Sequence, residues 1–155
     1  MTTPDLSDAD LVDGYAPLVV DRDTAGYYRG WLARELRPNR CVDCGHWHHP
    51  PRPMCPECWS WNVEPTAVTG NGTVYLLILL HQGPPAPGVD YGAGPYPVAA
   101  VELEEQAGLR ITSTIVGTPP HELSIGQAVE LTWIERNGLP FPAFRRTDAG
   151  EAVRP

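Results

Sequence analysis

Four cysteines in two close pairs are the residues of this sequence whose spacing most clearly indicates chemistry. The pairs read Cys41-Val-Asp-Cys44-Gly45 and Cys55-Pro-Glu-Cys58, with ten residues between them. Each turn brings two thiolates together, and four soft thiolates suit a tetrahedral zinc ion. Because four protein ligands leave no position for an activated water, the predicted zinc site is structural rather than catalytic. Its predicted ligands are Cys41, Cys44, Cys55 and Cys58.

Other uses of these cysteines have weaker support. Rubredoxin binds iron through similar turns, but its cysteine pairs are normally much farther apart in sequence. An iron site for electron transfer is therefore disfavoured here. Two disulfides are less favoured still, because closely paired thiols in a reducing compartment indicate metal or redox chemistry. His46, His48 and His49 lie beside the cysteines. With four thiols present, we interpret them as surface groups or as neighbours of the site, not as ligands.

Length and composition limit what the chain can be. Its 155 residues suffice for one core, or for a small module attached to one. The first ten residues lack the basic start and apolar run of a secretory signal, and nowhere do about 18 apolar residues follow one another. The sequence therefore predicts a cytoplasmic location without a membrane span.

The formal net charge of −8 is concentrated near the N-terminus. Six aspartates against Arg22 give residues 1–23 a charge of −5, which is typical of a solvated and poorly ordered leader. All eleven basic residues are arginines, and they form no basic stripe of the kind that nucleic-acid-binding proteins carry. Arg29, Arg37 and Arg40 are the available phosphate partners, although nothing in the sequence directs them at a ligand.

A short amphipathic helix is predicted between this leader and the cysteines, over residues 24–40. Tyr28, Trp31, Leu32 and Leu36 recur at the spacing of one helical face, and Pro38 ends the pattern. Gly26 and Gly30 each cost about 1 kcal/mol relative to alanine, so the helix is marginal unless its aromatic face is covered. The cover is either the protein's own core or a partner, and the sequence leaves both open.

From residue 66 onward the pattern is that of β-strands. The run 73–81 is almost continuously apolar, which predicts a strand buried on both faces. Residues 98–105 and 109–116 alternate and are joined by Gln106-Ala107-Gly108, a hairpin signal. A helical turn is expected near 118–123, and further strands at 127–136 and 140–146. Five strands with a small helix between the third and fourth predict an OB-fold barrel.

Residues 82–97 interrupt these strands with a loop rich in glycine and proline that carries Tyr91 and Tyr96. A loop this long is usually functional or disordered, and we favour an interaction role. The sequence contains no nucleophile elbow, phosphate loop or complete dinucleotide fingerprint. We therefore predict no catalytic residue and identify no cofactor-binding residue beyond the cysteines.

In combination, these motifs resemble the acyl-CoA-associated zinc-ribbon/OB-fold proteins, also called the domain of unknown function 35 family. The likeness covers about residues 27–146. Two positions depart from the family pattern: His49, where an aromatic residue is frequent, and Pro97, where a β-branched residue is usual and where the following strand is expected to shorten. The motifs that carry the likeness are Cys41-Val-Asp-Cys44-Gly45, His49-Pro50-Pro51-Arg52-Pro53-Met54-Cys55-Pro56-Glu57-Cys58, Gly72-Thr73-Val74-Tyr75, Pro95-Tyr96, Val101-Glu102-Leu103, Gly126 and Pro142-Ala143-Phe144-Arg145.

The resemblance implies a small accessory subunit for thiolase-like enzymes that act on CoA thioesters. Archaeal relatives bridge a thiolase and a hydroxymethylglutaryl-CoA synthase and offer a channel for acyl-CoA. Actinobacterial relatives pair with a lipid-transfer-protein-type thiolase homologue that acts as an aldolase on steroid side-chain CoA thioesters. By this resemblance an acyl-CoA ligand and a MaoC-type hydratase are further candidate partners.

The resemblance favours a non-catalytic accessory subunit of a thiolase-like aldolase or acyltransferase, in lipid metabolism and steroid degradation. The alternative is a zinc-ribbon/OB-fold nucleic-acid-binding module, which the acidic charge disfavours. The fold class is mainly β: an N-terminal helix, a rubredoxin-like zinc ribbon and a five-stranded OB-fold barrel. The predicted parts are an acidic flexible leader at 1–23, the helix at 24–40, the ribbon at 41–64, the OB fold at 65–147 and a tail at 148–155.

Overall fold

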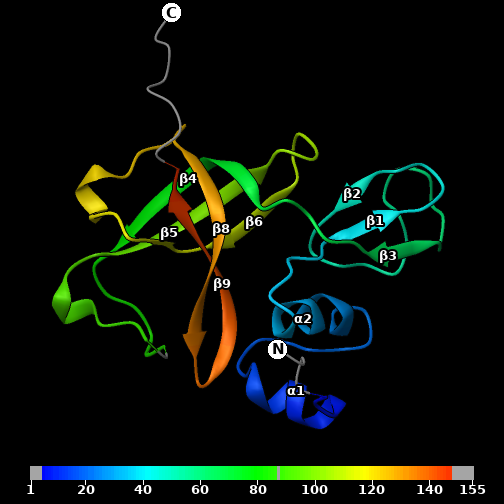
Figure 1. Cartoon of the computed structure of the whole chain (residues 1–155), viewed down its shortest axis with the longest axis horizontal. Coiled ribbons are helices and arrows are strands. Elements are labelled where there is room, and N and C mark those ends of the chain that lie inside the picture. Colours follow the sequence, from blue (N-terminus) through cyan, green and yellow to red (C-terminus); the bar gives the residue numbers. More distant parts are fainter. Residues whose placement is uncertain (1–4, 87, 148–155) are drawn as a thin grey trace, which may run out of the picture. The chain divides into compact units, whose positions relative to one another are not determined.

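The structure is a computed structural model that describes residues 5–86 and 88–147 (Figure 1). The chain divides into two compact units, one made of Met1–Thr69 and Ile134–Pro142, the other of Gly70–Trp133 and Ala143–Pro155. The predicted boundary at residue 64 stays a prediction, and the predicted tail at 148–155 lies outside the described residues. The main elements are α1 (Asp8–Gly14), α2 (Ala25–Leu32), β1 (Asn39–Cys41), β2 (Trp47–His48), β3 (Val63–Pro65), β4 (Asn71–Leu80), β5 (Tyr96–Leu103), β6 (Arg110–Ser113), β7 (Ile115–Val116), β8 (Ala128–Arg136) and β9 (Leu139–Arg146).

The acidic segment at the N-terminus contains a helix, α1. Ser7 is its N-cap, and the Ser7 hydroxyl accepts a hydrogen bond from the Asp10 amide. Leu11 is fully buried, and the hydroxyl of the buried Tyr15 donates to the carbonyl of Pro140 at 3.0 Å. The expectation of a flexible leader is therefore wrong for this stretch, because two buried side chains among the aspartates attach it to the first unit.

The second helix, α2, is shorter than the predicted helix over 24–40. Arg34 follows it with a left-handed φ of 57°, and the amides of Arg34 and Glu35 donate to the carbonyls of Trp31 and Gly30. These bonds form a Schellman cap, which ends the helix before Pro38 is reached. A Cβ at position 30 would lie 2.7 Å from the Glu35 carbonyl oxygen, so glycine is needed for the chain to fold back here.

An aromatic cluster covers the buried face of α2. The Trp31 ring lies 5.2 Å from the Tyr15 ring and 5.0 Å from the Phe141 ring, and Tyr27 and Trp31 are both about as buried as core residues. The sequence did not decide whether the protein's own core or a partner covers this helix face, and in the structure the first unit covers it. Tyr27, not Tyr28, is the buried tyrosine of the helix. No helix among the described residues is long and apolar enough to cross a bilayer.

The ribbon follows α2 as a small three-stranded sheet with the order β2-β1-β3, in which β1 pairs antiparallel with both neighbours. The Asn39 side chain, buried on β1, donates to the carbonyl of Arg52 at 3.0 Å and so attaches the loop between the cysteine pairs to the sheet. No large aliphatic side chain is buried between residues 41 and 64. The buried residues of that segment are Cys41, His48, Pro51 and Cys55.

The second unit contains most of a six-stranded sheet with the order β6-β5-β4-β8-β9-β7. β7 pairs parallel with β9, with Ile115 opposite Phe144. β6 and β7 are the two outer strands and only Thr114 separates them in sequence, so the sheet curls until its edges meet, as in a barrel. The predicted third strand, 109–116, is thus split between these two edges. The buried core includes Val74, Val101, Leu103, Ile111, Val129 and Phe144.

Two predictions about individual strands fail. Residues 73–80 of the run 73–81 lie in β4, but the strand is not buried on both faces: Tyr75, Leu76 and Ile78 are exposed. β4 pairs with β5 from Gly72 to Leu80, with an irregularity between Val74 and Leu76, but it pairs with β8 only from Asn71 to Thr73, so the exposed residues have a neighbouring strand on one side alone. Pro97 does not shorten the next strand either, since β5 begins at Tyr96 and Pro97 lies opposite Leu79.

Candidate metal centre

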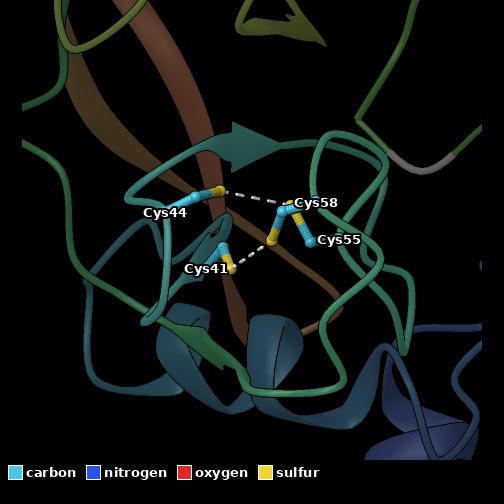
Figure 2. A group of neighbouring side chains, drawn as sticks. All are labelled: Cys41, Cys44, Cys55 and Cys58. Atoms are coloured by element: carbon cyan, nitrogen blue, oxygen red, sulfur yellow. Dashed lines mark hydrogen bonds between the residues drawn. The ribbon is translucent and has the colours of Figure 1, made fainter.

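Two tight turns of the ribbon bring the four predicted ligands together (Figure 2). One turn follows β1 and carries Cys41 and Cys44, and the other lies between β2 and β3 and carries Cys55 and Cys58. All four Sγ atoms lie within 4.8 Å of one another. Sγ of Cys41 is 3.6 Å from that of Cys58, and Sγ of Cys44 is 3.7 Å from that of Cys55.

The two turns have the same backbone hydrogen bonds. In the first, the Cys41 amide donates to the carbonyl of His46 at 2.8 Å, and the Gly45 amide donates back to Cys41 at 2.9 Å. In the second, the Cys55 amide donates to Ser60 at 2.8 Å and the Trp59 amide to Cys55 at 3.1 Å. Each pair of thiols is therefore held by its own closed turn, as in zinc knuckles.

The sulfur positions fit a tetrahedral zinc ion. Zinc–sulfur bonds of about 2.3 Å in a regular tetrahedron place the sulfurs about 3.8 Å apart, close to the two distances observed here. The same distances are far longer than a disulfide bond, and all four cysteines are free. The arrangement can hold one metal ion with four thiolates. All four coordination positions of the ion are then occupied by protein ligands, so none is open for a reacting water.

The neighbouring sulfurs change one another's acidity. The amide of Cys44 donates to the Cys41 sulfur, and this donation is the main reason that the pKa of Cys41 falls to about 7. The amide of His46 favours the thiolate of Cys44, yet desolvation and the sulfurs of Cys58, Cys41 and Cys55 together raise its pKa to about 12. Four thiolates at these distances repel one another, so the cluster is stable in its ionised form only around a cation.

The three histidines beside the cysteines have other surroundings. The buried His48 has its Nε2 3.3 Å from the carbonyl oxygen of Arg52, and the ring of His49 lies 4.9 Å from the ring of Tyr27. Burial lowers the pKa of His49 to about 4. Among the described residues, the group positioned for a metal ion consists of the four cysteines and includes no histidine.

A carboxylate that the sequence analysis did not single out connects the two turns. Asp43, in the first turn, accepts hydrogen bonds from the hydroxyl of Ser60 and from the side-chain amide of Asn62, both just beyond the second turn. The amide of Val42 donates to the carbonyl of Asn62 at 2.9 Å. The spacing of the cysteines carries no signal for this bridge, because it depends on how the two turns face each other.

The arginines considered as phosphate partners are already engaged. Arg29 contacts the carboxylate of Asp8, Arg37 donates to Glu35 at 2.7 Å, and the guanidinium of Arg40 lies 5.4 Å from the centre of the Trp47 ring. The structure therefore gathers none of the three around a common anion site.

Two domain families match consecutive parts of the chain. Residues 32–64 match the ChsH2 rubredoxin-like zinc ribbon domain, and residues 65–133 match the ChsH2 C-terminal OB-fold domain. These matches confirm the predicted fold, a rubredoxin-like zinc ribbon followed by an OB fold, and zinc as the metal that such a ribbon takes. The four cysteines all lie within the part that matches the ribbon.

Several known proteins are similar to this chain, including the following three. The 3-oxo-4,17-pregnadiene-20-carboxyl-CoA hydratase alpha subunit of Mycobacterium tuberculosis is 36% identical over 74% of this chain, which spans only about a third of that relative's length (34%). A DUF35 domain-containing scaffold protein of Pyrococcus furiosus is 37% identical over 74% of this chain and 78% of its own length. The solved structure of an Ltp2-ChsH2(DUF35) aldolase includes a chain 37% identical, with a TM-score of 0.74, covering 83% of this chain and 98% of that one.

Proposed function

The chain belongs to the DUF35 family, and from this membership we propose that it is a non-catalytic accessory subunit of a thiolase-like, lipid-transfer-protein-type enzyme acting on CoA thioesters. The observation that carries the proposal is the 37% identity to a chain of the Ltp2-ChsH2(DUF35) aldolase, almost all of which this chain covers. The name of the archaeal relative, a DUF35 domain-containing scaffold protein, supports a structural role.

The role that we propose for the metal centre is to hold the ribbon in shape. Cys41, Cys44, Cys55 and Cys58 supply four thiolates to one zinc ion, and the ion supplies charge neutralisation and a cross-link between the two turns. No step of a reaction passes through it. In this proposal the partner enzyme contributes the nucleophile and the base, while this chain contributes an interface and stability.

The substrate class that we propose is a steroid side-chain CoA thioester, cleaved by a retro-aldol reaction on the partner. Two names support it: the aldolase of the solved structure and the pregnadiene carboxyl-CoA hydratase subunit of M. tuberculosis. The second name also supports a neighbouring hydratase of the MaoC type, which would supply the hydroxyl group that a retro-aldol cleavage requires. We further propose that this chain contacts the acyl-CoA directly by lining part of its binding site.

The test is to produce this chain with the lipid-transfer-protein-type thiolase homologue of the same host and to measure assembly and activity. We expect the two to co-elute in gel filtration, and the aldolase activity on a β-hydroxyacyl-CoA to require both. A chain that elutes alone beside a fully active partner would contradict the proposal. Cleavage of the same thioester by this chain alone would contradict its non-catalytic part.

The nucleic-acid-binding alternative has weaker support. Both ribbons and OB folds serve that purpose, but the chain carries a net charge of −8, and nucleic-acid affinity depends on neutralising phosphates. On the sheet, the exposed Tyr75 is covered by the guanidinium of Arg110, which lies 3.5 Å from its ring centre and also donates to Glu102. An electrophoretic shift with single-stranded DNA at moderate salt separates the two functions, and tight binding would favour this alternative.

A further inference from the structure

The position after the second cysteine is geometrically equivalent in the two zinc turns, but it is occupied by a glycine in one and by a tryptophan in the other. Gly45 follows the second cysteine of the first turn with a left-handed φ of 77°, and Trp59 follows the second cysteine of the second turn with a φ of 64°. Their amides make the same hydrogen bond, to Cys41 and Cys55 respectively. The left-handed conformation is free of steric cost for glycine but strained for a bulky side chain, so the second turn carries strain that the first does not.

The strained backbone conformation does not bury the indole of Trp59 against the described part of the chain. The Trp59 residue is 70% exposed, and Trp61, two positions farther along the same loop, is 73% exposed. Neither indole stacks on another ring within residues 5–86 and 88–147, whereas Tyr27 and Trp31 of the same unit are almost completely buried. A large apolar side chain that occupies a strained position without gaining burial indicates a contact outside the chain.

The loop that carries both tryptophans is held in place before any partner binds. Ser60, which lies between them, donates its hydroxyl to Asp43, and the amide of Asn62 donates to that hydroxyl oxygen at 3.0 Å. The amide of Val63 donates to the carbonyl of Trp61 at 3.0 Å. Because the backbone is fixed by the zinc turn on one side and by these bonds on the other, little conformational entropy is lost when the indoles are buried.

The charge of the segment that carries these tryptophans indicates what they meet. Residues 41–64 contain three carboxylates, Asp43, Glu57 and Glu64, against the single Arg52, and a zinc ion with four thiolates adds a further two negative charges. A surface that receives this segment is therefore complementary when it is basic. Tryptophan and arginine are the residues most enriched among the energetically dominant contacts of protein interfaces.

We infer that Trp59 and Trp61, here called the tip tryptophans, anchor this chain in an apolar pocket with an arginine- or lysine-rich rim on the thiolase-like partner. This inference rests on the proposed function, since it names the surface that the accessory subunit uses. It assigns Trp59 a binding role that accounts for the absence of glycine from the second turn.

The experiment measures the dissociation constant of the partner enzyme, by isothermal titration calorimetry, for the native chain and for three variants. Trp59→Gly and Trp61→Ser remove one indole each. Val19→Ser is the matched control, because Val19 is also 73% exposed but lies outside the ribbon. We expect each tryptophan variant to bind about 30-fold or more weakly, and the control to stay within about twofold of the native chain. The affinity of the native chain falls as salt rises.

Thermal stability distinguishes this role from a structural one. Because Trp59→Gly relieves backbone strain, it keeps its zinc and raises the melting temperature by about 2–4 °C. Tryptophan variants that bind as tightly as the native chain would overturn the inference and leave the proposed function intact. A native chain that does not bind the partner would overturn both. Quenching of the indole fluorescence by single-stranded DNA would overturn the protein partner in favour of nucleic acid.

Discussion

The zinc ribbon, residues 41–64, and the OB sheet, β4 to β9, obtain their order in different ways. In the ribbon the side chains turned inward are two cysteines, a histidine and a proline, and every large apolar residue is at least partly exposed. The sheet has a continuous apolar core in which Val101, Ile111 and Phe144 are almost inaccessible to solvent. One segment therefore depends on a metal ion, whereas the other depends on apolar burial.

The two segments also expose different apolar residues. A ribbon held by zinc does not need its tryptophans inside, so Trp59 and Trp61 are available for contacts with a partner. The sheet leaves Tyr75, Leu76 and Ile78 exposed only where β4 has lost its pairing with β8. In the ribbon, exposed apolar residues thus accompany the proposed metal cross-link, and in the sheet they lie where β4 has a neighbouring strand on one side alone.

Replacement of a zinc ligand is expected to have the largest effect and to act on the ribbon alone. Cys44→Ser removes one of four thiolates, so the chain loses stoichiometric zinc and the ribbon loses its fixed structure, because structural zinc contributes on the order of 10 to 16 kcal/mol in small modules. Amide resonances of residues 41–64 should collapse toward random-coil positions, while those of β5 and β6 keep their dispersion. If the dispersed sheet resonances were lost as well, the order of the sheet would also depend on the metal ion, contrary to this expectation.

A matched variant at a neighbouring histidine tests the identity of the ligands. His49→Ala leaves all four thiols in place and is expected to retain one zinc ion per chain, measured by mass spectrometry under native conditions and by elemental analysis. Loss of the metal from this variant would show that the ligand set is wrong. Stoichiometric iron in the native chain would show that the metal is wrong.

Truncation of a side chain in the core of the sheet is expected to have the next largest effect. It should destabilise the sheet and leave the zinc site of the ribbon intact. Phe144 is fully buried on β9, and Phe144→Ala should cost about 3–5 kcal/mol through lost burial and the cavity that remains. Chemical denaturation monitored by circular dichroism measures this loss, and the zinc content should not change. A cost below about 1 kcal/mol would show that the sheet does not depend on its apolar core.

The contact between the ribbon loop and α2 should be sensitive to pH. Burial lowers the pKa of His49 to about 4 in the folded chain, against about 6.5 when unfolded, so folding favours the neutral ring. The stability that depends on this neutral ring is complete above pH 6.5 and declines as the pH falls from 6.5 toward 4, by at most about 3 kcal/mol.

The substitution His49→Phe should remove this dependence while retaining a ring against Tyr27, whose centre lies 4.9 Å from that of His49. Acid also protonates the thiols, so the measurement is the difference in unfolding free energy between the native chain and the variant at each pH. If the difference stays constant between pH 7 and 4, the neutral His49 ring contributes nothing to the attachment of the ribbon loop.

The parts of the fold that the sequence predicted are those with local signals. The paired cysteines, the alternating strands and the turn at Gln106-Ala107-Gly108 depend on neighbours within a few residues. The helix in the leader was missed because Leu11 and Tyr15 are isolated among aspartates, and their burial depends on partners such as Pro140, 125 positions away. Composition alone does not carry such distant contacts.

The candidate site shows the same division. The four cysteines were predictable from spacing, but the bridge from Asp43 to Ser60 and Asn62 depends on how two turns face each other. Trp59 did have a local signal, since glycine follows the equivalent cysteine of the first turn, but its left-handed φ was needed to give that difference a physical meaning. The pairing of β4 with β8 over only three residues had no signal in the apolar run.

Removal of a surface charge from the OB sheet should have the smallest effect on the unfolding free energy, because this sheet is ordered by apolar burial. Glu102 accepts hydrogen bonds from Arg110 at 3.0 Å and from the Gly108 amide at 3.1 Å, where β5 turns into β6. Because the pair is partly exposed and screened by water, Glu102→Gln should change the unfolding free energy by less than about 1 kcal/mol. The glutamine oxygen can still accept from Gly108, and Arg110 keeps its position over Tyr75. Chemical denaturation at low and high salt measures the effect: a loss above about 2 kcal/mol that disappears in high salt would mean that charge, and not only apolar burial, orders this sheet.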